Sequence, residues 1–594
     1  MKTAAIDFET YYDDTFGITL QGTRNYIFDS RFDAYMVTIK TDTGIEYAGP
    51  PADFDWSQIS GAGWQWIHHN ASFDELVLSR IRTDGIIPPT AKPEVTHCTA
   101  DLCAYLGGPR NLAGASKFFL DEEVSKETRT AMKGKSWASM TTEFREEVTR
   151  YAMRDSELCL DLWLKLSDQW PDTERLLSRH TRAIAWDGIP IDVAELDKSI
   201  PELSRRNWEA GTRLPWYHDG DEKPLSPKAL AEECRKVGIE PPPSLAKDSA
   251  DCAAWEDKYG ETYPWVAAMR EYRRTNTLLE RLKAMRARVM PSGDMNFGLL
   301  YFGASVTGRW SGADGVNVQN LPAKPMFGVD FRGLLRAPAG YKFINADLSQ
   351  IEPRCLAWLV GNEPLLQKLR EGMAIYEAHA RTSMRWTGGK LKNEDAHLYA
   401  LAKARVLSLG YGAGAEKFVI MAANYGIKLT LEEADSVVQA FRASEPLVCG
   451  RDGLWNQLQR GMTQAAAKRE TYQIELPSGR LLRYMRPSQL GGLSAETTSG
   501  RGIIRKKWWG GSLTENLVQA TARDVFASFI PIIEYELGLP ILFHVHDELT
   551  CLVEEDKAED ALRDLLQVMR TPPSFMPGLP LDAEGKIVDS YPNK

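Results

Sequence analysis

Three short acidic motifs near the N-terminus have the residue types and spacing of a carboxylate metal site. The stretch "AAIDFET" reads as an apolar strand, and the two-residue period of a strand places Asp7 and Glu9 on one face. Two adjacent carboxylates repel each other unless a cation lies between them. "HHNASFDELVL" then places Asp74 near a predicted helix start, and "YAMRDSELCLDLW" places Tyr151 and Asp155 on one helical face. Each motif alone is usually a surface acid or a helix cap, so their order along the chain is the stronger signal.

A second acidic pair lies in the C-terminal half. In "ADLSQIEPR", Ser349 and Glu352 have the spacing of a helix-capping box, but that interpretation leaves Asp347 unexplained. Asp347 ends a predicted strand, and a buried carboxylate needs a partner such as a cation. "ILFHVHDELTCLV" reads as a strand, a turn around Asp547 and a returning strand. Asp347 and Asp547 together could hold two Mg²⁺ ions against a nucleoside triphosphate.

The elements that must position these acids belong to a chain of several domains. With 594 residues, the chain is too long for one hydrophobic core, and two to four domains are expected. Its 43% hydrophobic and 26% charged residues are typical of a globular protein. The eight cysteines form no CxxC pair, which argues against a zinc ribbon and a disulfide scaffold. Acids interrupt "MKTAAIDFET" too early for a signal peptide, and no apolar run reaches the ~20 residues of a membrane-spanning helix.

The net charge of −10 argues weakly against nucleic acid as a partner. Net charge misleads, however, when acids gather in sites and bases gather on faces. The segment Arg270–Arg288, which reads as a helix, holds seven Arg or Lys residues against Glu271 and Glu280. Such a cluster is usually a solvated face, and it becomes informative only where the neighbouring chemistry concerns phosphate.

The ordered N-terminal motifs resemble the DEDDy type of 3′–5′ exonuclease, the proofreading domain of DNA polymerases. The resemblance implies that Asp7, Glu9, Asp74 and Asp155 hold metal ions and that Tyr151 orients the attacking water. Two divalent ions in such a site activate water and stabilise the leaving 3′ oxygen. Oxygen-rich ligands of this kind suit Mg²⁺ or Mn²⁺.

From about residue 180 onward, the chain resembles family A DNA polymerases of the bacterial polymerase I and phage type. The likeness rests on "TGRWSGADGVNVQNLP", "ADLSQIEPR", "LAKARVLSLGYGAG" and "HVHDE". Two further stretches, "LPSGRLLRY" and "TENLVQATARD", are similar to the phage branch. The implied fold is α/β and multidomain, with an RNase H-like exonuclease domain followed by a right-hand polymerase of palm, fingers and thumb.

The resemblance also implies roles for individual polymerase residues. Asp347 and Asp547 would hold two metal ions, with Glu548 as an accessory acid near the primer end, and Glu352 would crowd a ribose 2′-OH. The residues expected to contact the incoming dNTP are Gln350, Glu352, Tyr376, Lys403, Leu407 and Tyr411. The residues expected to contact primer–template DNA are Arg309, Gln319, Gln519 and His546.

One helix is expected to carry much of the nucleotide site. Lys403, Leu407 and Tyr411 are spaced at i, i+4 and i+8, so they would share one face of a fingers helix. Lys403 would meet the triphosphate, and loss of such a charge-assisted contact at the transition state costs a few kcal/mol. Tyr411 would stack beside the templating base pair.

The chain departs from the family pattern at three positions. Tyr399 stands where the fingers helix usually has an arginine, so either Arg405 or Arg381 substitutes, or triphosphate binding rests on fewer cations. Leu407 stands where an aromatic residue is usual, and Glu515 where polymerase I proteins tend to have asparagine. A further hypothesis is that the nucleotide site accepts modified purines such as 2-aminoadenine.

The resemblance divides the chain into five segments. They are a 3′–5′ proofreading exonuclease domain (1–170), a linker and thumb (171–295), a first palm segment (296–362), the fingers (363–500) and a second palm segment (501–594). The basic segment Arg270–Arg288 would lie in the thumb and grip duplex phosphates. The expected partners are primer–template DNA and dNTPs, with no membrane. The expected protein is a monomeric phage replicase in the cytoplasm of the host.

Three alternatives stay open. A nuclease with a degenerate C-terminal half is disfavoured because Asp347 and Asp547 are both present. An RNA polymerase or primase with a similar palm is disfavoured by Glu352 and by the complete proofreading series, and ribonucleotide incorporation would discriminate it. A non-catalytic DNA-binding factor would bind primer–template tightly without magnesium-dependent extension.

Overall fold

The structure is a computed structural model that describes residues 1–124, 127–217, 223–245, 250–313, 315–499 and 502–593. The chain divides into two compact units. The first comprises Met1–Trp186, Leu299–Gly312 and Lys342–Ile587, and the second comprises Asp187–Gly298, Ala313–Tyr341 and Val588–Lys594. Both candidate sites of acidic residues therefore belong to the first unit.

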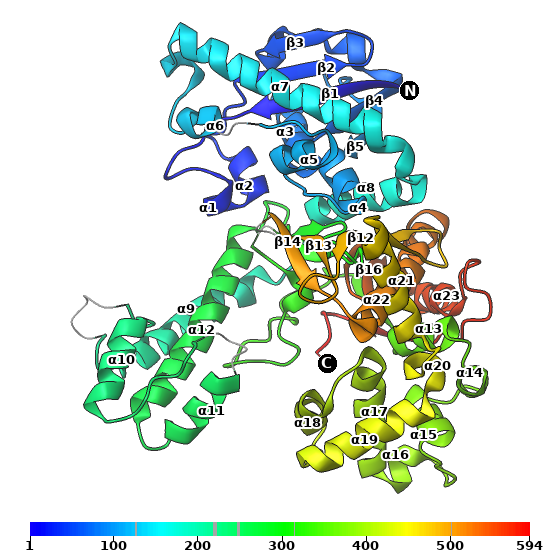
Figure 1. The fold of residues 1–594 in the computed structure, drawn as a ribbon. Helices are drawn as coiled ribbons and strands as arrows, with labels where there is room; N and C mark the ends of the chain where they lie inside the picture. Colours follow the sequence, from blue (N-terminus) through cyan, green and yellow to red (C-terminus); the bar gives the residue numbers. More distant parts are fainter. Residues whose placement is uncertain (125–126, 218–222, 246–249, 314, 500–501, 594) are drawn as a thin grey trace. The chain divides into compact units, whose positions relative to one another are not determined.

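The N-terminal part of the first unit is built on a mixed five-stranded sheet in the order β3-β2-β1-β4-β5 (Figure 1). The strands are β1 (Lys2–Glu9), β2 (Met36–Thr41), β3 (Glu46–Gly49), β4 (Gly61–His68) and β5 (Pro93–Cys98). The central strand β1 pairs antiparallel with β2 and parallel with β4. Helix α7 (Thr142–Leu166) packs against β1 and β2, and α3 (Ala71–Thr83) packs against β1, β4 and β5.

A second sheet, in the order β15-β16-β10-β17, lies in the C-terminal half. Its strands are β10 (Tyr341–Leu348), β15 (Ile541–Val545), β16 (Glu548–Glu554) and β17 (Ala583–Val588). The helices associated with this sheet include α13 (Ile351–Leu359), α22 (Gly510–Pro531) and α23 (Ala558–Arg570). Residues 343–346 of β10 are buried, so this strand runs through the core and delivers Asp347 at its end.

A group of helices lies between β10 and β15 in the sequence. Its main helices are α15 (Ile375–Ser383), α17 (Ala396–Ser408), α18 (Ala415–Ala423), α19 (Leu431–Ser444) and α21 (Leu454–Lys468). Asp395 caps α17 by accepting a hydrogen bond from the backbone of Leu398, and Thr430 with Glu433 forms a capping box on α19. A third sheet, β11-β12-β13-β14, follows within residues 472–507.

The second unit is a helical body around α9 (Val193–Gly211) and α12 (Pro264–Ala287), which pack against each other. The predicted basic helix is therefore present. Several of its basic residues are already engaged, since Arg273 pairs with Glu256 at 2.6 Å and Arg286 pairs with Asp197 at 2.5 Å. The number of cations that α12 can offer to phosphate is smaller than its composition indicates.

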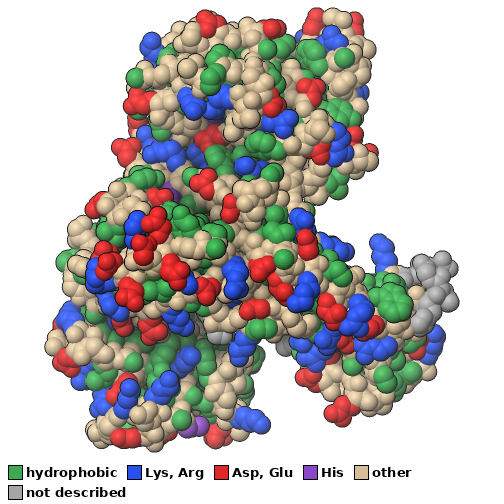
Figure 2. Space-filling view, turned by 180° about the vertical axis from the view of Figure 1, so that it is seen from behind, with side chains coloured by type: hydrophobic (Ala, Val, Ile, Leu, Met, Phe, Trp, Pro, Cys, Tyr) green, Lys and Arg blue, Asp and Glu red, His purple; other side chains and the backbone are tan. Residues whose placement is uncertain are grey.

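The surface and the cysteines agree with the composition. On the face in Figure 2, acidic and basic side chains are interspersed. None of the eight cysteines, all of which lie in the described part of the chain, forms a disulfide bond. In the part of the chain that the structure describes, none of the helices combines the length and apolar content that crossing a membrane requires.

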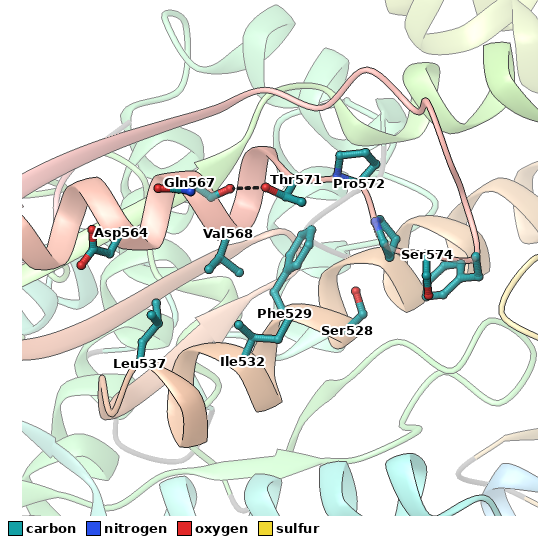
Figure 3. A pocket seen from close by; sticks show the side chains of 12 residues that line it. Ser528, Phe529, Ile532, Leu537, Asp564, Gln567, Val568, Thr571, Pro572 and Ser574 are labelled. Carbon is teal, nitrogen blue, oxygen red and sulfur yellow. Dashed lines mark hydrogen bonds between the residues drawn. The ribbon is translucent and has the colours of Figure 1, made fainter.

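A cavity of about 590 Å³ lies between the C-terminal end of α22 and helix α23 (Figure 3). Phe529, Ile532 and Val568 form part of its apolar wall, and Thr571 donates a hydrogen bond to the carbonyl of Gln567 at its rim. None of the predicted site residues lines this cavity, so the candidate chemistry must be sought elsewhere.

Candidate active sites

The first candidate site begins at the C-terminal end of β1. The neighbours Ile6 and Phe8 are buried, whereas Asp7 and Glu9 are half-buried, so the two carboxylates share one face of the strand as predicted. The paired strand β2 and the parallel strand β4 hold β1 on both sides. The two acids are therefore carried by the central strand of this sheet.

Two helices bring the other acids to this strand. Asp74 lies in the first turn of α3, near the helix start as predicted, and Asn70 precedes the helix with a φ of 138°. Asp155 and Tyr151 lie one turn apart on α7, and the Tyr151 hydroxyl is among the influences that lower the pKa of the Asp155 carboxyl, which burial raises. Asp74 is 2% exposed, so its carboxylate has almost no access to bulk water.

The carboxylates influence one another strongly. Burial and then the charge of Asp155 raise the pKa of Asp7 to about 8. Burial and then the charge of Asp7 raise the pKa of Glu9 and that of Asp74 as well. The charges of Asp7 and Asp155 act on neighbouring carboxyls, so Asp7, Glu9, Asp74 and Asp155 lie within electrostatic reach of one another, although they come from three separate elements.

This donor set fits a divalent cation. The Oδ1 atoms of Asp74 and Asp155 are buried and have no hydrogen-bond partner. Carboxylate oxygens without donors around them are the ligands that Mg²⁺ and Mn²⁺ prefer. Asp7, Glu9, Asp74 and Asp155 would hold the ions. Among the described residues, no three His, Cys, Asp or Glu side chains are already arranged as metal ligands, so these carboxylates would have to close around an ion.

One basic residue at this site escaped the sequence analysis. The positive charge of Arg129, on α6 (Glu127–Met132), is among the influences that lower the pKa values of Asp7, Glu9 and Asp155. Tyr12, three residues beyond β1, donates a hydrogen bond to the Arg129 carbonyl at 2.6 Å. The motif pattern contains no signal for Arg129, because it lies in a short helix between the second and third acidic motifs.

The carboxylate site should make stability depend on pH when divalent ions are absent. An aspartate whose pKa rises from 3.8 in the unfolded chain to about 8 in the folded one loses its proton first in the unfolded chain. The free energy of unfolding is therefore expected to fall as pH rises between these two values. Millimolar Mg²⁺ at pH 8 is expected to add roughly RT ln(1+[Mg²⁺]/Kd) to the free energy of unfolding. The first melting temperature should therefore rise by a few °C.

Calorimetric scans at pH 5 and pH 8, with Mg²⁺ or with a chelator, check this expectation. The Asp7→Asn variant should melt at a higher temperature than the wild type in chelator at pH 8, and its response to Mg²⁺ should be smaller. An equal Mg²⁺ response in the wild type and in Asp7→Asn would contradict the assignment of Asp7.

The second candidate site lies where β10 meets the β15–β16 hairpin. The backbone N–H of Leu348 donates a hydrogen bond to the carbonyl of Asp547 at 3.1 Å, which sets Asp347 beside the hairpin turn. Both carboxylate residues are half-buried at the ends of buried strands. Two strand ends thus present two acids together, as the sequence predicted, and this donor set also suits a divalent ion.

Glu548 lies just outside the hairpin turn. It is the first residue of β16 and is 1% exposed, so only residues 546 and 547 form the turn. The side-chain amide of Asn345 on β10 donates a hydrogen bond to Glu548 Oε1 at 3.0 Å and another to Thr550 Oγ1 at 2.9 Å. Glu548 is therefore held within the sheet, beneath the acids at the strand ends.

The predicted capping box at Ser349 and Glu352 is not formed. Gln350, in the left-handed region with a φ of 46°, is the N-cap of α13 and makes no side-chain capping bond. The helix therefore starts one residue later than the box requires. Glu352 instead forms an ion pair with Arg309, the residue expected to contact DNA. These two predicted site residues are in contact with each other.

The fingers residues gather around two tyrosine rings. The Lys403 ammonium lies 5.8 Å from the ring centroid of Tyr376 and 5.0 Å from that of Tyr425. The ring of Tyr399 packs edge-on against Tyr376, with centroids 5.7 Å apart. Leu407 packs into the same apolar cluster. Tyr399 therefore supports the wall of the predicted nucleotide site, where the family pattern has an arginine.

Tyr411 is not on the helix that carries Lys403 and Leu407. Helix α17 ends at Ser408, and Tyr411 belongs to a 3-10 turn closed by Gly412 at a φ of 86°. The prediction of one shared helical face is therefore wrong for Tyr411. Its hydroxyl is buried without a hydrogen-bond partner, and burial followed by the nearby charge of Glu352 raises its pKa.

Neither Arg381 nor Arg405 is available to replace the arginine that the family usually has at the position of Tyr399. Arg381 pairs with Glu377 at 2.8 Å and donates hydrogen bonds to the carbonyls of Gly388 and Gly389. Arg405 is 5% exposed and donates a hydrogen bond to Ser444 at 3.3 Å. These contacts favour the alternative in which triphosphate binding rests on fewer cations, with Lys403 as the main one.

The other residues that were predicted to contact the dNTP or DNA lie in several different elements. Gln519 on α22 donates a hydrogen bond to Glu515 at 3.3 Å. Gln350 and His546 are exposed at left-handed backbone positions, with φ values of 46° and 58°. Gln319 belongs to the second unit, in a 3-10 turn (Val318–Asn320).

Comparisons with known proteins agree with the polymerase half of this arrangement. The model of DNA polymerase family A matches residues 226–593. A DNA polymerase of Bacillus phage SP02 is 29% identical, and the alignment covers 88% of this chain and 88% of the phage protein. The thermostable DNA polymerases I of Thermus filiformis and Thermus aquaticus are 27% and 26% identical. This chain spans about half the length of each, 51% and 52%, while the alignments cover 74% and 76% of this chain.

A solved structure resembles the whole chain. It is the POL domain of Pol1 from M. smegmatis in complex with DNA primer-template and dNTP. The TM-score is 0.66 at 19% sequence identity, and the alignment covers 94% of this chain and 93% of that one. The likeness confirms the predicted α/β multidomain polymerase fold. The family match begins at residue 226, so it does not include the five-stranded sheet.

Proposed function

The chain belongs to DNA polymerase family A, and on that premise we propose that it extends a DNA primer with dNTPs and removes mispaired 3′ ends by proofreading. The backbone hydrogen bond between Leu348 and Asp547 is the main support for the proposed synthesis site, because it places Asp347 and Asp547 side by side at two strand ends. The phage relative supports a replicative role in the cytoplasm of an infected cell. A monomer bound to primer–template DNA is the proposed working form, and the five-segment division of the chain stays part of the proposal.

In the proposed synthesis step, the deprotonated primer 3′ oxygen attacks the α-phosphorus of the dNTP in line. A new phosphodiester bond forms, the bond to the bridging oxygen breaks, and pyrophosphate leaves. Divalent ions such as Mg²⁺, two in each site, would lower the pKa of the attacking hydroxyl or water and neutralise charge on the leaving group. Asp347 and Asp547 would hold them for synthesis, with Glu548 as an accessory acid that orders the sheet beneath.

The fingers residues would orient the triphosphate. Lys403 would contact its phosphates, with its ammonium steered by the rings of Tyr376 and Tyr425. Tyr376, Leu407 and Gln350 would border the base and sugar, and Tyr411 would stack beside the templating pair. Arg309, Gln319, Gln519 and His546 would contact primer–template DNA.

Glu352 is proposed to exclude ribonucleotides by occupying the space of a 2′-OH. The Glu352→Ala variant is expected to lower the ratio of kcat/KM for dNTPs over rNTPs roughly 10- to 100-fold, because the pocket no longer rejects the hydroxyl. Single-nucleotide incorporation on a primed template measures this ratio, and Glu363→Ala, an exposed acid on the next helix, is the matched control. Efficient rNTP incorporation by the wild type would instead favour an RNA polymerase or primase. The same assay with 2-aminoadenine triphosphate tests the modified-purine hypothesis.

The proofreading proposal is supported by the convergence of four carboxylates from β1, α3 and α7. Asp7, Glu9, Asp74 and Asp155 would hold the ions at the 3′ phosphodiester. Tyr151, one turn from Asp155 on α7, would orient the water that attacks phosphorus. The bond from that phosphorus to the 3′ oxygen of the preceding nucleotide would break, and the 3′ nucleotide would leave as a monophosphate. Arg129 is suitably charged to contact the phosphate of the cleaved strand.

A further inference from the structure

Helix α8 (Asp172–Asp187) forms hydrogen bonds with both ends of the segment 301–310 in the polymerase half. At one end, the hydroxyl of Tyr301 donates a hydrogen bond to Glu174 Oε2 at 2.7 Å. At the other, the indole N–H of Trp310 donates a hydrogen bond to Thr181 Oγ1 at 2.8 Å. The segment between them contains the Thr307–Gly308–Arg309 sequence that leads into the proposed nucleotide site.

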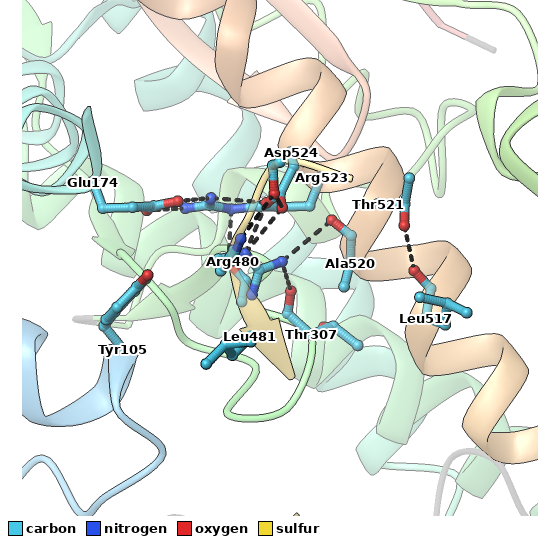
Figure 4. Close-up of polar contacts among 12 residues, drawn as sticks. Tyr105, Glu174, Thr307, Arg480, Leu481, Leu517, Ala520, Thr521, Arg523 and Asp524 are labelled. Carbon is cyan, nitrogen blue, oxygen red and sulfur yellow. Dashed lines mark hydrogen bonds and ion pairs between the residues drawn. The ribbon is translucent and has the colours of Figure 1, made fainter. Parts of the chain in front are cut away.

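Glu174 also holds a buried arginine of the palm. Arg523 on α22 forms two hydrogen bonds with the Glu174 carboxylate, at 2.5 and 2.9 Å (Figure 4). The Arg523 side chain is 2% exposed. A charge buried this deeply is costly unless it is paired, and the Glu174 carboxylate supplies a two-point pairing for this guanidinium.

Two arginines hold the Thr307–Gly308 turn by its carbonyls. Arg523 Nε donates a hydrogen bond to the Gly308 carbonyl at 3.1 Å. Arg480 Nη2 donates one to the Thr307 carbonyl at 2.9 Å (Figure 4). Asp524 accepts hydrogen bonds from Arg480 Nε and Arg523 Nη1, which joins the two arginines. Gly308 has a φ of 77°, and a Cβ there would lie 2.6 Å from the Phe302 ring, so the turn is closely packed.

The next residue after this turn is Arg309, which pairs with Glu352. We propose that Glu174 is a positioning residue of the polymerase site, which acts through Arg523 and the Thr307–Gly308 turn to hold Arg309 against Glu352. This inference rests on the proposed function of Glu352 in excluding ribonucleotides. The segment 171–295, which the sequence assigned to a linker and thumb, would thereby contribute to sugar selection.

The Glu174→Gln variant tests the proposal. It keeps the size of the side chain and removes the charge that holds Arg523. Single-nucleotide incorporation with dNTPs and rNTPs is expected to show a fall of about 10-fold in the dNTP-over-rNTP ratio of kcat/KM, in the same direction as Glu352→Ala but smaller. The control is Asp172→Asn on the same helix, whose side chain is 97% exposed, and it should leave the ratio unchanged.

A double variant distinguishes positioning from general damage. If Glu174 acts through Glu352, the ratio for Glu174→Gln combined with Glu352→Ala should equal that for Glu352→Ala alone. A loss of structure would instead lower both activities and the melting temperature without this equality. If Glu174→Gln folds poorly, Tyr301→Phe removes one bond to Glu174 without removing a charge, and it should lower the ratio by a smaller factor.

The outcomes separate the inference from the proposed function. A wild type that does not extend primers overturns both. A wild type that extends and discriminates against rNTPs, together with an unchanged ratio in Glu174→Gln and Tyr301→Phe, overturns the positioning role alone. Independent, multiplicative effects of Glu174→Gln and Glu352→Ala also overturn it, because they would place the action of Glu174 elsewhere.

Discussion

Replacement of Asp347 by alanine is expected to reduce primer extension by at least ~10³-fold, a loss of about 4 kcal/mol of transition-state stabilisation. Asp347 and Asp547 lie together at two strand ends, and either one alone cannot supply the ligands for the ions that the chemistry needs. The effect should appear in kcat, because these ligands act on the charge that develops during phosphoryl transfer. A primer-extension assay under single-turnover conditions, with Mg²⁺ and all four dNTPs, measures it.

The matched control for Asp347→Ala is Asp556→Ala, an exposed acid that follows β16 in the same sheet region. It should extend primers at the wild-type rate. Exonuclease activity of Asp347→Ala on single-stranded DNA should also be preserved, because the proposed exonuclease acids lie on β1, α3 and α7, away from β10. Undiminished extension by Asp347→Ala would show that the synthesis site is misassigned.

Replacement of Asp7 by alanine is expected to abolish 3′ degradation, again by ~10³-fold or more, and to leave extension of matched primers intact. Burial and the charges of neighbouring carboxylates raise the pKa values of Asp7, Glu9 and Asp74, so a bound cation would offset the cost of ionising these acids together. Loss of one ligand removes most of the affinity for that cation. Release of labelled mononucleotides from single-stranded DNA measures the activity.

The control for Asp7→Ala is Asp53→Ala, an exposed acid in the same part of the chain. Asp53→Ala should degrade DNA at the wild-type rate. Retained degradation in Asp7→Ala would mean that the nuclease site lies elsewhere, and loss of both activities would mean that the substitution disturbs the fold.

The sequence was sufficient to find the strands and the acids on them. Apolar runs bounded by acids mark β1 and β10, and strand periodicity alone places Asp7 and Glu9 on one face. The four-residue spacing of Tyr151 and Asp155 likewise places both side chains on one face of α7. These features depend on local geometry, which a short stretch of chain determines by itself.

Contacts between distant segments could not be predicted in this way. The helix after β10 starts at Ile351, one residue later than the capping-box pattern requires, so Glu352 pairs with Arg309 from another segment. Tyr411 leaves the helical face because α17 ends at Ser408 and a 3-10 turn follows. Tertiary packing overrides local preference in each case, and single-sequence patterns do not contain that packing.

The buried charges were also beyond the reach of sequence patterns. Glu174 and Arg523 are separated by 349 positions, and neither belongs to a short motif that signals the other. Arg129 likewise acts only because the fold brings α6 to the end of β1. Such pairs become visible only when distances between side chains are known.

The most direct test of the two-site hypothesis uses one primer with a mispaired 3′ nucleotide and compares three proteins in Mg²⁺ with all four dNTPs. The wild type should remove the mispaired nucleotide and then extend to full length with the correct sequence. Asp347→Ala should only shorten the primer, and Asp7→Ala should only extend it slowly with the mismatch retained. Parallel loss of shortening and extension in both variants would contradict two separate carboxylate sites.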